Sequence, residues 1–159
     1  MNNWSNPSLA PYVPTPEEVV RHMLTLAEVK PREKVYDLGC GDGRILVIAA
    51  QEFGADAVGV ELSLERVKIG RERVSSLGLD EKVKIFYGNI FDVDISPADI
   101  VTLYLTTSAN EKLKPKLEKE LRAGTRVVSH DFTMPGWKLV KMDRVQEDYR
   151  THMIYLYYR

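Results

Sequence analysis

Apolar and polar positions along the chain follow two periods, and each change of period marks a predicted element. Short runs rich in β-branched and apolar residues predict strands at 34–39, 57–62, 82–89, 99–105 and 125–132. Apolar residues three and four positions apart predict helices at 16–30, 44–53, 64–78 and 109–121. Two more strands are expected at about 137–146 and 152–159, with no helix between them.

This order of elements determines the expected fold class. Strands that alternate with helices form a parallel sheet, and two strands in direct succession form an antiparallel hairpin. The chain should therefore adopt an α/β fold. We expect a Rossmann-like, doubly wound seven-strand sheet, mostly parallel, with an antiparallel C-terminal hairpin and helices on both faces.

Local signals refine the helix boundaries. Thr15 precedes Pro16 and stands three residues before Glu18, which predicts an N-cap and capping box for the first helix. Ser63 should cap the third helix. Pro115 falls inside the fourth and should restart or kink it.

Composition narrows the class of protein and its compartment. The chain has 159 residues and a net charge of −1, without the basic excess of a protein built to grip nucleic acid. Its one cysteine, Cys40, excludes an intramolecular disulfide and favours a reducing, cytoplasmic location. We find no apolar run of membrane-spanning length, and residues 1–10 lack the features of a signal peptide.

The stretch VYDLGCGDGR at 35–44 follows a predicted strand and opens a predicted helix. Glycines there allow a tight turn and close approach of a ligand to the backbone. A dinucleotide fingerprint needs a glycine where this chain has Arg44. The spacing Gly39-x-Gly41-x-Gly43 after Asp37 instead resembles motif I of the class I S-adenosylmethionine-dependent methyltransferases.

Three successive strands end in polar residues. Asp37 suits the cofactor's ammonium group, and Glu61, about 20 residues beyond the glycines, suits a ribose diol. Asn89 offers both a donor and an acceptor to adenine. Each could also be an ordinary turn or strand-end residue, but their order favours one crevice for S-adenosyl-L-methionine. The adjacent Cys40, Leu62 and Ile90 are expected to line it, with Cys40 a buried loop residue rather than a nucleophile.

The residues that follow the fourth strand should indicate which chemical group accepts the methyl. YLTTSAN at 104–110 lacks the Asp/Asn-Pro-Pro-Tyr/Phe motif of amino-methyltransferases acting on adenine or glutamine. Asp131 stands without the carboxylate cluster that a metal-dependent catechol enzyme needs, so we expect no metal.

PYVPTPEEVV, VYDLGCGDGRI, NEKLKPKLEKEL and GTRVVSHDF together resemble the small archaeal protein-lysine methyltransferases. That group is related to mitochondrial enzymes that methylate a lysine of an ATP-synthase subunit. The resemblance covers about residues 11–159 and implies one methyltransferase domain there, after a flexible N-terminus at 1–10. It also implies that Tyr12 and Thr15, in an N-terminal arm before the first helix, cover the cofactor and roof a lysine channel.

A lysine substrate makes a chemical demand. At pH 7 only about one lysine amine in 2,500 is neutral and nucleophilic. Desolvation and the nearby sulfonium both lower the lysine pKa, so an aromatic-walled channel could suffice without a dedicated base. The candidate channel residues are Tyr104, Thr106, His130 and Trp137, with Phe132 as a further aromatic. His130 could be a general base, but a histidine at a strand end more often satisfies a local hydrogen bond.

The leading hypothesis is a broad-range protein-lysine N-methyltransferase that transfers the methyl group in line to a deprotonated amine. Its partners would be proteins with exposed lysines, itself included, and a monomer would suffice. An RNA or small-molecule methyltransferase on the same fold is the alternative. The third hypothesis is an interaction module that binds the cofactor but catalyses no methyl transfer.

Overall fold

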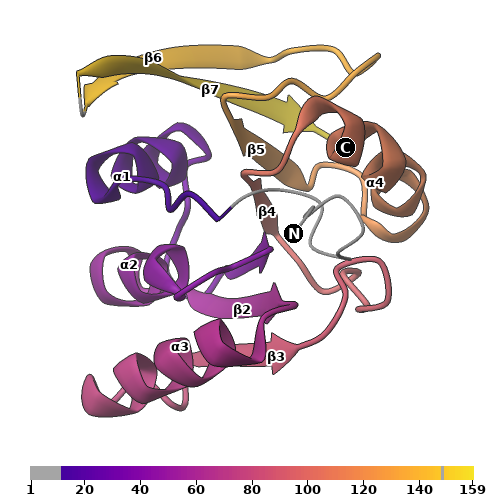
Figure 1. Ribbon diagram of the computed structural model, residues 1–159. Helices are drawn as coiled ribbons and strands as arrows, with labels where there is room; N and C mark the ends of the chain where they lie inside the picture. The colour runs from indigo at the N-terminus through magenta and orange to yellow at the C-terminus, as the bar shows by residue number, and fades with distance from the viewer. Residues whose placement is uncertain (1–11, 148) are drawn as a thin grey trace, which may run out of the picture.

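The computed structural model describes residues 12–147 and 149–159. They form one seven-stranded sheet flanked by helices (Figure 1). The helices are α1 (Glu17–Leu26), α2 (Arg44–Phe53), α3 (Leu64–Ser76) and α4 (Thr107–Glu120). The strands are β1 (Lys34–Leu38), β2 (Asp56–Glu61), β3 (Val83–Tyr87), β4 (Ile100–Leu103), β5 (Arg126–His130), β6 (Lys141–Glu147) and β7 (Arg150–Tyr158).

The strand order is β3-β2-β1-β4-β5-β7-β6, and this order creates the site. The five strands from β3 to β5 run parallel, while β7 pairs antiparallel with both β5 and β6. The predicted fold class is thus confirmed, including the C-terminal hairpin. Successive strands are added on one side of β1 as far as β3 and on its other side from β4 onwards, and this switch opens a crevice at the carboxyl ends of β1 and β4.

Helices cover both faces of the sheet, as Figure 1 shows. One apolar cluster joins α1, α2 and α3 to side chains such as Val35, Ile85 and Val128. A second joins Leu113 and Leu117 of α4 to the opposite face. Alternate residues along the strands enter the two clusters, as the two-residue period of a strand requires.

Several boundaries differ from those predicted. The α1 helix begins at Glu17 with Pro16 in the N-cap position, so the expected Thr15 cap was wrong. Thr15 is buried, and its hydroxyl is hydrogen-bonded to His130 across the sheet edge. The Ser63 cap is confirmed, since its hydroxyl accepts from the Arg66 N–H at 3.4 Å. The α4 helix runs through Pro115 without restarting.

Two predictions concern the N-terminal segment. We expected residues 1–10 to be flexible and the domain to start at residue 11. Both predictions concern residues outside the described part of the chain. In the described part of the chain, no helix combines the length and apolarity needed to cross a membrane.

Candidate active site at the carboxyl edge of the sheet

A cavity of about 130 Å³ opens at the carboxyl ends of β1, β2 and β4. Its wall combines five separate parts of the chain: the arm before α1, the loop after β1, and the segments that follow β2, β3 and β4. A parallel sheet brings these connections to one edge, so residues distant in sequence share one pocket.

The glycine loop is folded tightly against β2. The N–H groups of Gly39 and Cys40 both donate to the Val60 carbonyl at 2.9 Å. Gly41 has a φ of 56°, and a Cβ added there would lie 2.6 Å from Cε1 of Tyr12. Glycine is therefore needed at position 41 both for the backbone conformation and for the close approach of the Tyr12 ring.

Glu61 ties the end of β2 to this loop. Its Oε1 accepts from the Gly41 N–H at 2.8 Å, and its Oε2 accepts from the Ser63 N–H at 2.9 Å. The carboxylate is buried and lies 3.8 Å from the Arg66 guanidinium. The loop and the start of α3 therefore share one negatively charged anchor in the cavity wall.

Asp37 lies at the floor of the cavity near the end of β1. Its Oδ1 accepts from the Thr102 hydroxyl at 2.8 Å. Burial raises the pKa of the Asp37 carboxyl to about 7, with smaller upward contributions from Glu61 and Asp42 that the Thr102 hydrogen bond opposes. A buried carboxyl of this kind is stabilised in its charged form by a bound cation, so it suits the ammonium group of a ligand.

The N-terminal arm lies across the loop and is held at two points. The Arg66 guanidinium stacks over the Tyr12 ring, 3.8 Å from its centroid. Arg44 donates to the Thr15 carbonyl at 3.4 Å while pairing with Asp42 at 2.8 Å. Both arginines come from helices that start beside the cavity, so the arm is fixed to the edge that it covers.

Tyr104 forms the wall beyond β4. Its ring stacks on the His130 imidazole, with centroids 3.8 Å apart, and faces Phe132 at 6.1 Å. Its hydroxyl accepts from Arg150 at 3.3 Å. One edge of the cavity is thus a stacked aromatic group backed by a buried histidine.

This arrangement can be compared with known proteins. Residues 37–141 match the ANTKMT methyltransferase domain. The chain belongs to this family. It is 51% identical over 148 residues to a protein-lysine N-methyltransferase of Saccharolobus islandicus, covering 92% of each chain. It is 34% identical to the mouse adenine nucleotide translocase lysine N-methyltransferase, spanning 82% of this chain and 56% of the mouse enzyme.

A solved structure also resembles the chain closely. It is a protein described as an RNA methyltransferase from Salinibacter ruber, in complex with S-adenosyl-L-homocysteine. The TM-score is 0.87 and the identity 42%, over 92% of this chain and 93% of that one. The predicted methyltransferase class and its cofactor, S-adenosyl-L-methionine, are thus confirmed.

The structure brings most of the predicted site residues of this methyltransferase to the cavity wall. Phe132, which faces Tyr104, is not part of the wall, and of the other fifteen predicted residues eleven line it. They are Tyr12, Thr15, Asp37, Gly39, Cys40, Gly41, Glu61, Leu62, Asn89, Ile90 and Tyr104. Burial raises the pKa of the Cys40 thiol well above its usual range, which agrees with a packing role.

The other four predicted residues lie outside this wall. Gly43 is the left-handed N-cap of α2, and Thr106 is the N-cap of α4, accepting from the Ala109 N–H at 3.0 Å. His130 lies behind Tyr104 and Thr15. Trp137 packs edge-on against Tyr157 and donates to Glu118 of α4 at 3.0 Å. These contacts hold Trp137 against α4 and β7, and its channel role stays a prediction.

Sequence reasoning missed several side chains that shape the site, among them Asp42, Arg66 and Thr102. Thr102 faces Asp37 because β1 and β4 pair with these two residues in register. Arg66 reaches the cavity because it lies in the first turn of α3. A polar threonine within the apolar run IVTL was a usable signal for Thr102, but its partner could be named only once the strand order was known.

Proposed function

We propose that this chain transfers a methyl group from S-adenosyl-L-methionine to the side-chain amine of lysine in proteins, over a broad range of targets. The observation that carries this proposal is the 51% identity to a protein-lysine N-methyltransferase across 92% of both chains. The cavity agrees with it, because its acidic and amide groups suit the cofactor and its far wall is aromatic.

The residues of the cavity wall divide into groups that match parts of the cofactor. Asp37 would hold the ammonium group, and Glu61 would accept hydrogen bonds from the ribose hydroxyls. Asn89 and the apolar Ile90 would receive the adenine. When bound, the cofactor supplies an electrophilic methyl on a sulfonium. Tyr12 lies over the glycine loop, where it would exclude water from the ligand.

The protein's remaining task is to deliver a neutral amine in line with that methyl. Tyr104, Leu105 and Phe91 present apolar surface to the cavity. Loss of hydration disfavours the charged form of a lysine, so an amine entering this wall releases its proton more readily than in water. Positioning and desolvation then account for the transfer without a covalent intermediate.

The test uses cofactor labelled in its methyl group and a denatured, RNA-free protein lysate. We expect label on lysine side chains of many proteins, the enzyme included, when digests are analysed by mass spectrometry. Asp37→Asn under the same conditions is the matched control and should label far less. Efficient labelling of other residue types, with lysine unlabelled, would exclude lysine as the methyl acceptor.

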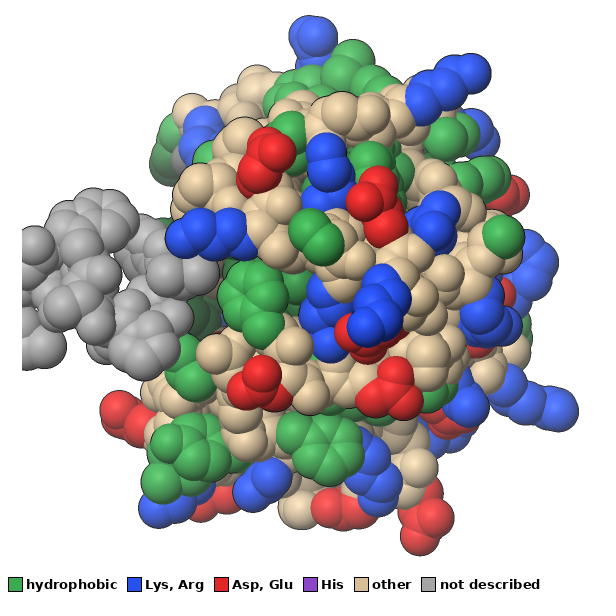
Figure 2. Space-filling model, turned by 90° about the vertical axis from the view of Figure 1, so that its right-hand side faces the viewer, with side chains coloured by type: hydrophobic (Ala, Val, Ile, Leu, Met, Phe, Trp, Pro, Cys, Tyr) green, Lys and Arg blue, Asp and Glu red, His purple; other side chains and the backbone are tan. Residues whose placement is uncertain are grey.

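RNA is the second candidate, because the Salinibacter ruber neighbour is described as an RNA methyltransferase. Figure 2 shows one face of the molecule, on which Lys and Arg side chains are interspersed with Asp, Glu and hydrophobic side chains and form no continuous basic surface. The net charge of −1 agrees. A parallel incubation with total RNA should therefore give little label, and strong labelling of RNA alone would favour this second function.

We also propose that a single chain in the cytoplasm is the working unit. One chain supplies every side chain that we assign to the cavity wall, and the sequence has a single, buried cysteine. Light scattering during chromatography should give the mass of one chain. A dimer that persists at nanomolar concentration would contradict this.

A further inference from the structure

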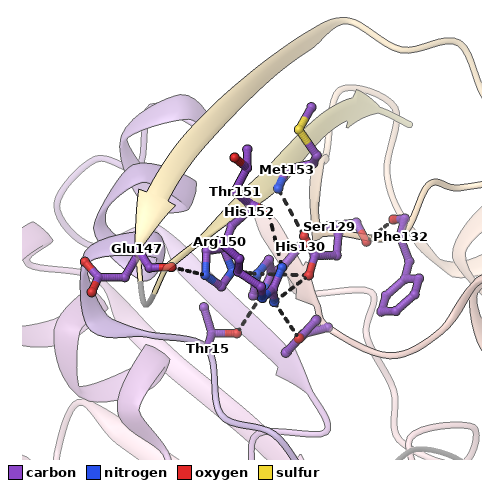
Figure 3. Close-up of polar contacts among 11 residues, drawn as sticks. Thr15, Ser129, His130, Phe132, Glu147, Arg150, Thr151, His152 and Met153 are labelled. Carbon is purple, nitrogen blue, oxygen red and sulfur yellow. Dashed lines mark hydrogen bonds and ion pairs between the residues drawn. The ribbon is translucent and has the colours of Figure 1, made fainter.

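Two buried histidines form a hydrogen-bonded pair behind the cavity. His130 at the end of β5 and His152 in β7 have exposed fractions of 0% and 2%. Nε2 of His130 lies 2.8 Å from Nδ1 of His152 (Figure 3). At such a distance between two ring nitrogens, one must donate and the other must accept. The direction of the bond depends on what the two remaining nitrogens contact.

The contact of His152 on the side away from His130 determines that direction. Nε2 of His152 lies 3.2 Å from the backbone carbonyl of Glu147. A carbonyl can only accept, so this nitrogen carries the hydrogen, and in a neutral imidazole the other nitrogen, Nδ1, is then the acceptor. Nε2 of His130 must then donate to it. The Asp131 carboxylate, 3.5 Å from Nε2 of His130, favours the same protonation.

The other nitrogen of His130, Nδ1, is linked to the cavity by the side chain of Thr15. With its hydrogen on Nε2, neutral His130 has an unprotonated Nδ1, and this atom lies 3.0 Å from the Thr15 hydroxyl. The hydroxyl must therefore donate to His130. A hydroxyl has one hydrogen and two lone pairs, so its accepting side stays available. Thr15 belongs to the cavity wall, as does Tyr104, whose ring covers His130.

We propose that His130 and His152 are positioning residues that hold the Thr15 hydroxyl as a donor to His130, so that its lone pairs accept a hydrogen bond from the amine of the incoming lysine. This inference rests on the proposed function. The pair gives direction to an otherwise freely rotating hydroxyl, and the hydroxyl in turn orients the nitrogen that attacks the methyl group. In this arrangement His130 is not a general base, because both its nitrogens are engaged.

The same side chains could suggest a metal site, since ligand atoms of His130, Asp131 and His152 lie within 4.8 Å of one another. Two observations favour the hydrogen-bonded pair. The two ring nitrogens that would face the ion are hydrogen-bonded to each other. The carboxylate of Asp131 is already paired with the Arg150 guanidinium at 2.8 Å, and that positive charge opposes a cation.

The surroundings keep His130 neutral at physiological pH. Burial lowers the pKa of His130 to about 4; the nearby Asp131 opposes this shift, while His152 and Arg150 add to it. Tyr104 covers the ring and Thr15 caps its inner nitrogen, and neither is charged near pH 7. The donor direction from Thr15 to His130 should therefore hold throughout the neutral range.

The first test reads the direction of the bonds without any turnover. Two-bond proton–nitrogen correlation spectra of the ¹⁵N-labelled wild-type protein at pH 7 distinguish the two imidazole tautomers. We expect His130 and His152 each to carry hydrogen on Nε2, with spectra unchanged by a chelator. Hydrogen on Nδ1 of His130 would overturn the proposal, as would shifts that disappear on removal of bound zinc.

The second test is a double-mutant cycle with Thr15→Val and His130→Phe, two substitutions that preserve shape and remove the hydrogen bond. Thr15→Val should lower kcat at saturating cofactor about 10- to 100-fold, the range for a bond to a charged or polarised group. Thr15→Ser should retain most of the activity. Because His130 acts through Thr15, the double variant should be no slower than Thr15→Val alone.

Calorimetry with S-adenosyl-L-homocysteine accompanies each variant and confirms that it is folded. The affinity of each variant for this ligand should stay within about threefold of wild type, because the proposal assigns the Thr15 hydroxyl to the amine rather than to the cofactor. Loss of cofactor affinity with unchanged kcat, or multiplicative effects in the double variant, would overturn the proposal. If the wild type labels no protein lysine, the proposed function fails, and the spectra still decide the direction of the histidine pair.

Discussion

Gly41 shows how one missing side chain shapes the site. The Tyr12 ring occupies the space that a Cβ at position 41 would need, 2.6 Å from Cε1. We predict that Gly41→Ala displaces Tyr12 and weakens S-adenosyl-L-homocysteine binding at least tenfold, as measured by calorimetry. The left-handed φ of 56° adds about 1 kcal/mol of backbone strain.

Gly78 provides the matched control. It too has a positive φ, 69°, but within the described residues no atom would lie within 4 Å of an added Cβ. Gly78→Ala should therefore lower the free energy of unfolding by a similar amount, about 1 kcal/mol, and leave cofactor affinity unchanged. Equal losses of affinity in both variants would show that strain, and not the Tyr12 contact, controls binding.

Asp37 makes cofactor binding dependent on pH. Its pKa of about 7 in the empty site should fall when a cation binds beside it, so binding releases a proton. At pH 7 we expect release of about half a proton, seen as a dependence of the binding enthalpy on the ionisation enthalpy of the buffer. Affinity should rise as the pH increases through 7.

Asp37→Asn removes this titration. The variant should bind S-adenosyl-L-homocysteine about 10- to 100-fold more weakly, with an enthalpy that no longer depends on the buffer. Proton release that persists in Asp37→Asn would assign the titration to another group.

Sequence reasoning at the residue scale succeeded where position along a strand determines the role. Asp37, Glu61 and Asn89 were predictable because each lies at or just beyond the end of a parallel strand, and such ends meet at one edge. Thr102 and Arg66 were not predictable, because their importance lies in contacts with Asp37 on the neighbouring strand and with Tyr12 in the arm. Those contacts depend on register and helix rotation, which local patterns do not specify.

At the scale of elements, caps and tertiary hydrogen bonds compete for the same side chains. Thr15 has the pattern of an N-cap, yet its hydroxyl bonds to His130 and α1 starts two residues later. A buried histidine leaves an unsatisfied nitrogen if it lacks a partner, whereas an exposed helix end can use water. The capping signal was therefore one residue away from the observed start of the helix and wrong about the role of the threonine.

Thr106 differs from its prediction in the opposite way. We expected it in the substrate channel, but in the structure it caps α4. Thr106→Ala should lower the free energy of unfolding by about 1 kcal/mol in urea titrations, and Thr106→Ser should not. Ser63→Ala, which removes the cap of α3, should cost a similar amount, about 1 kcal/mol. A tenfold fall in kcat for Thr106→Ala, without such a fall for Ser63→Ala, would restore the channel role.

At the scale of the whole molecule, the alternation of strands and helices predicted the sheet and its closing hairpin. The pattern did not specify that β7 would insert between β5 and β6, and this insertion brings His152 beside His130. No pattern in the sequence surrounds His152, and the stretch GTRVVSHDF, which contains His130, does not indicate its partner. The histidine pair is therefore a product of topology, and it could be found only in the folded structure.

That pair should affect the stability of the entire fold. His130 has a pKa of about 4 in the native state and about 6.5 when unfolded, so between these values the unfolded chain binds more protons. Stability then rises with pH through this window and falls on acidification. Asp37, whose native pKa is raised to about 7, binds a proton in the native state and acts in the opposite direction over the same range.

A comparison of variants separates the two contributions. From pH 7 to pH 5 the wild type should lose about 2 kcal/mol more unfolding free energy than His130→Phe, because the variant lacks the titrating imidazole. Asp37 is common to both proteins and cancels in the difference. Urea titrations at the two pH values measure it. Equal losses in both proteins would mean that His130 is protonated as readily in the folded state as in the unfolded chain, and a protonated His130 could not accept the hydrogen bond from Thr15.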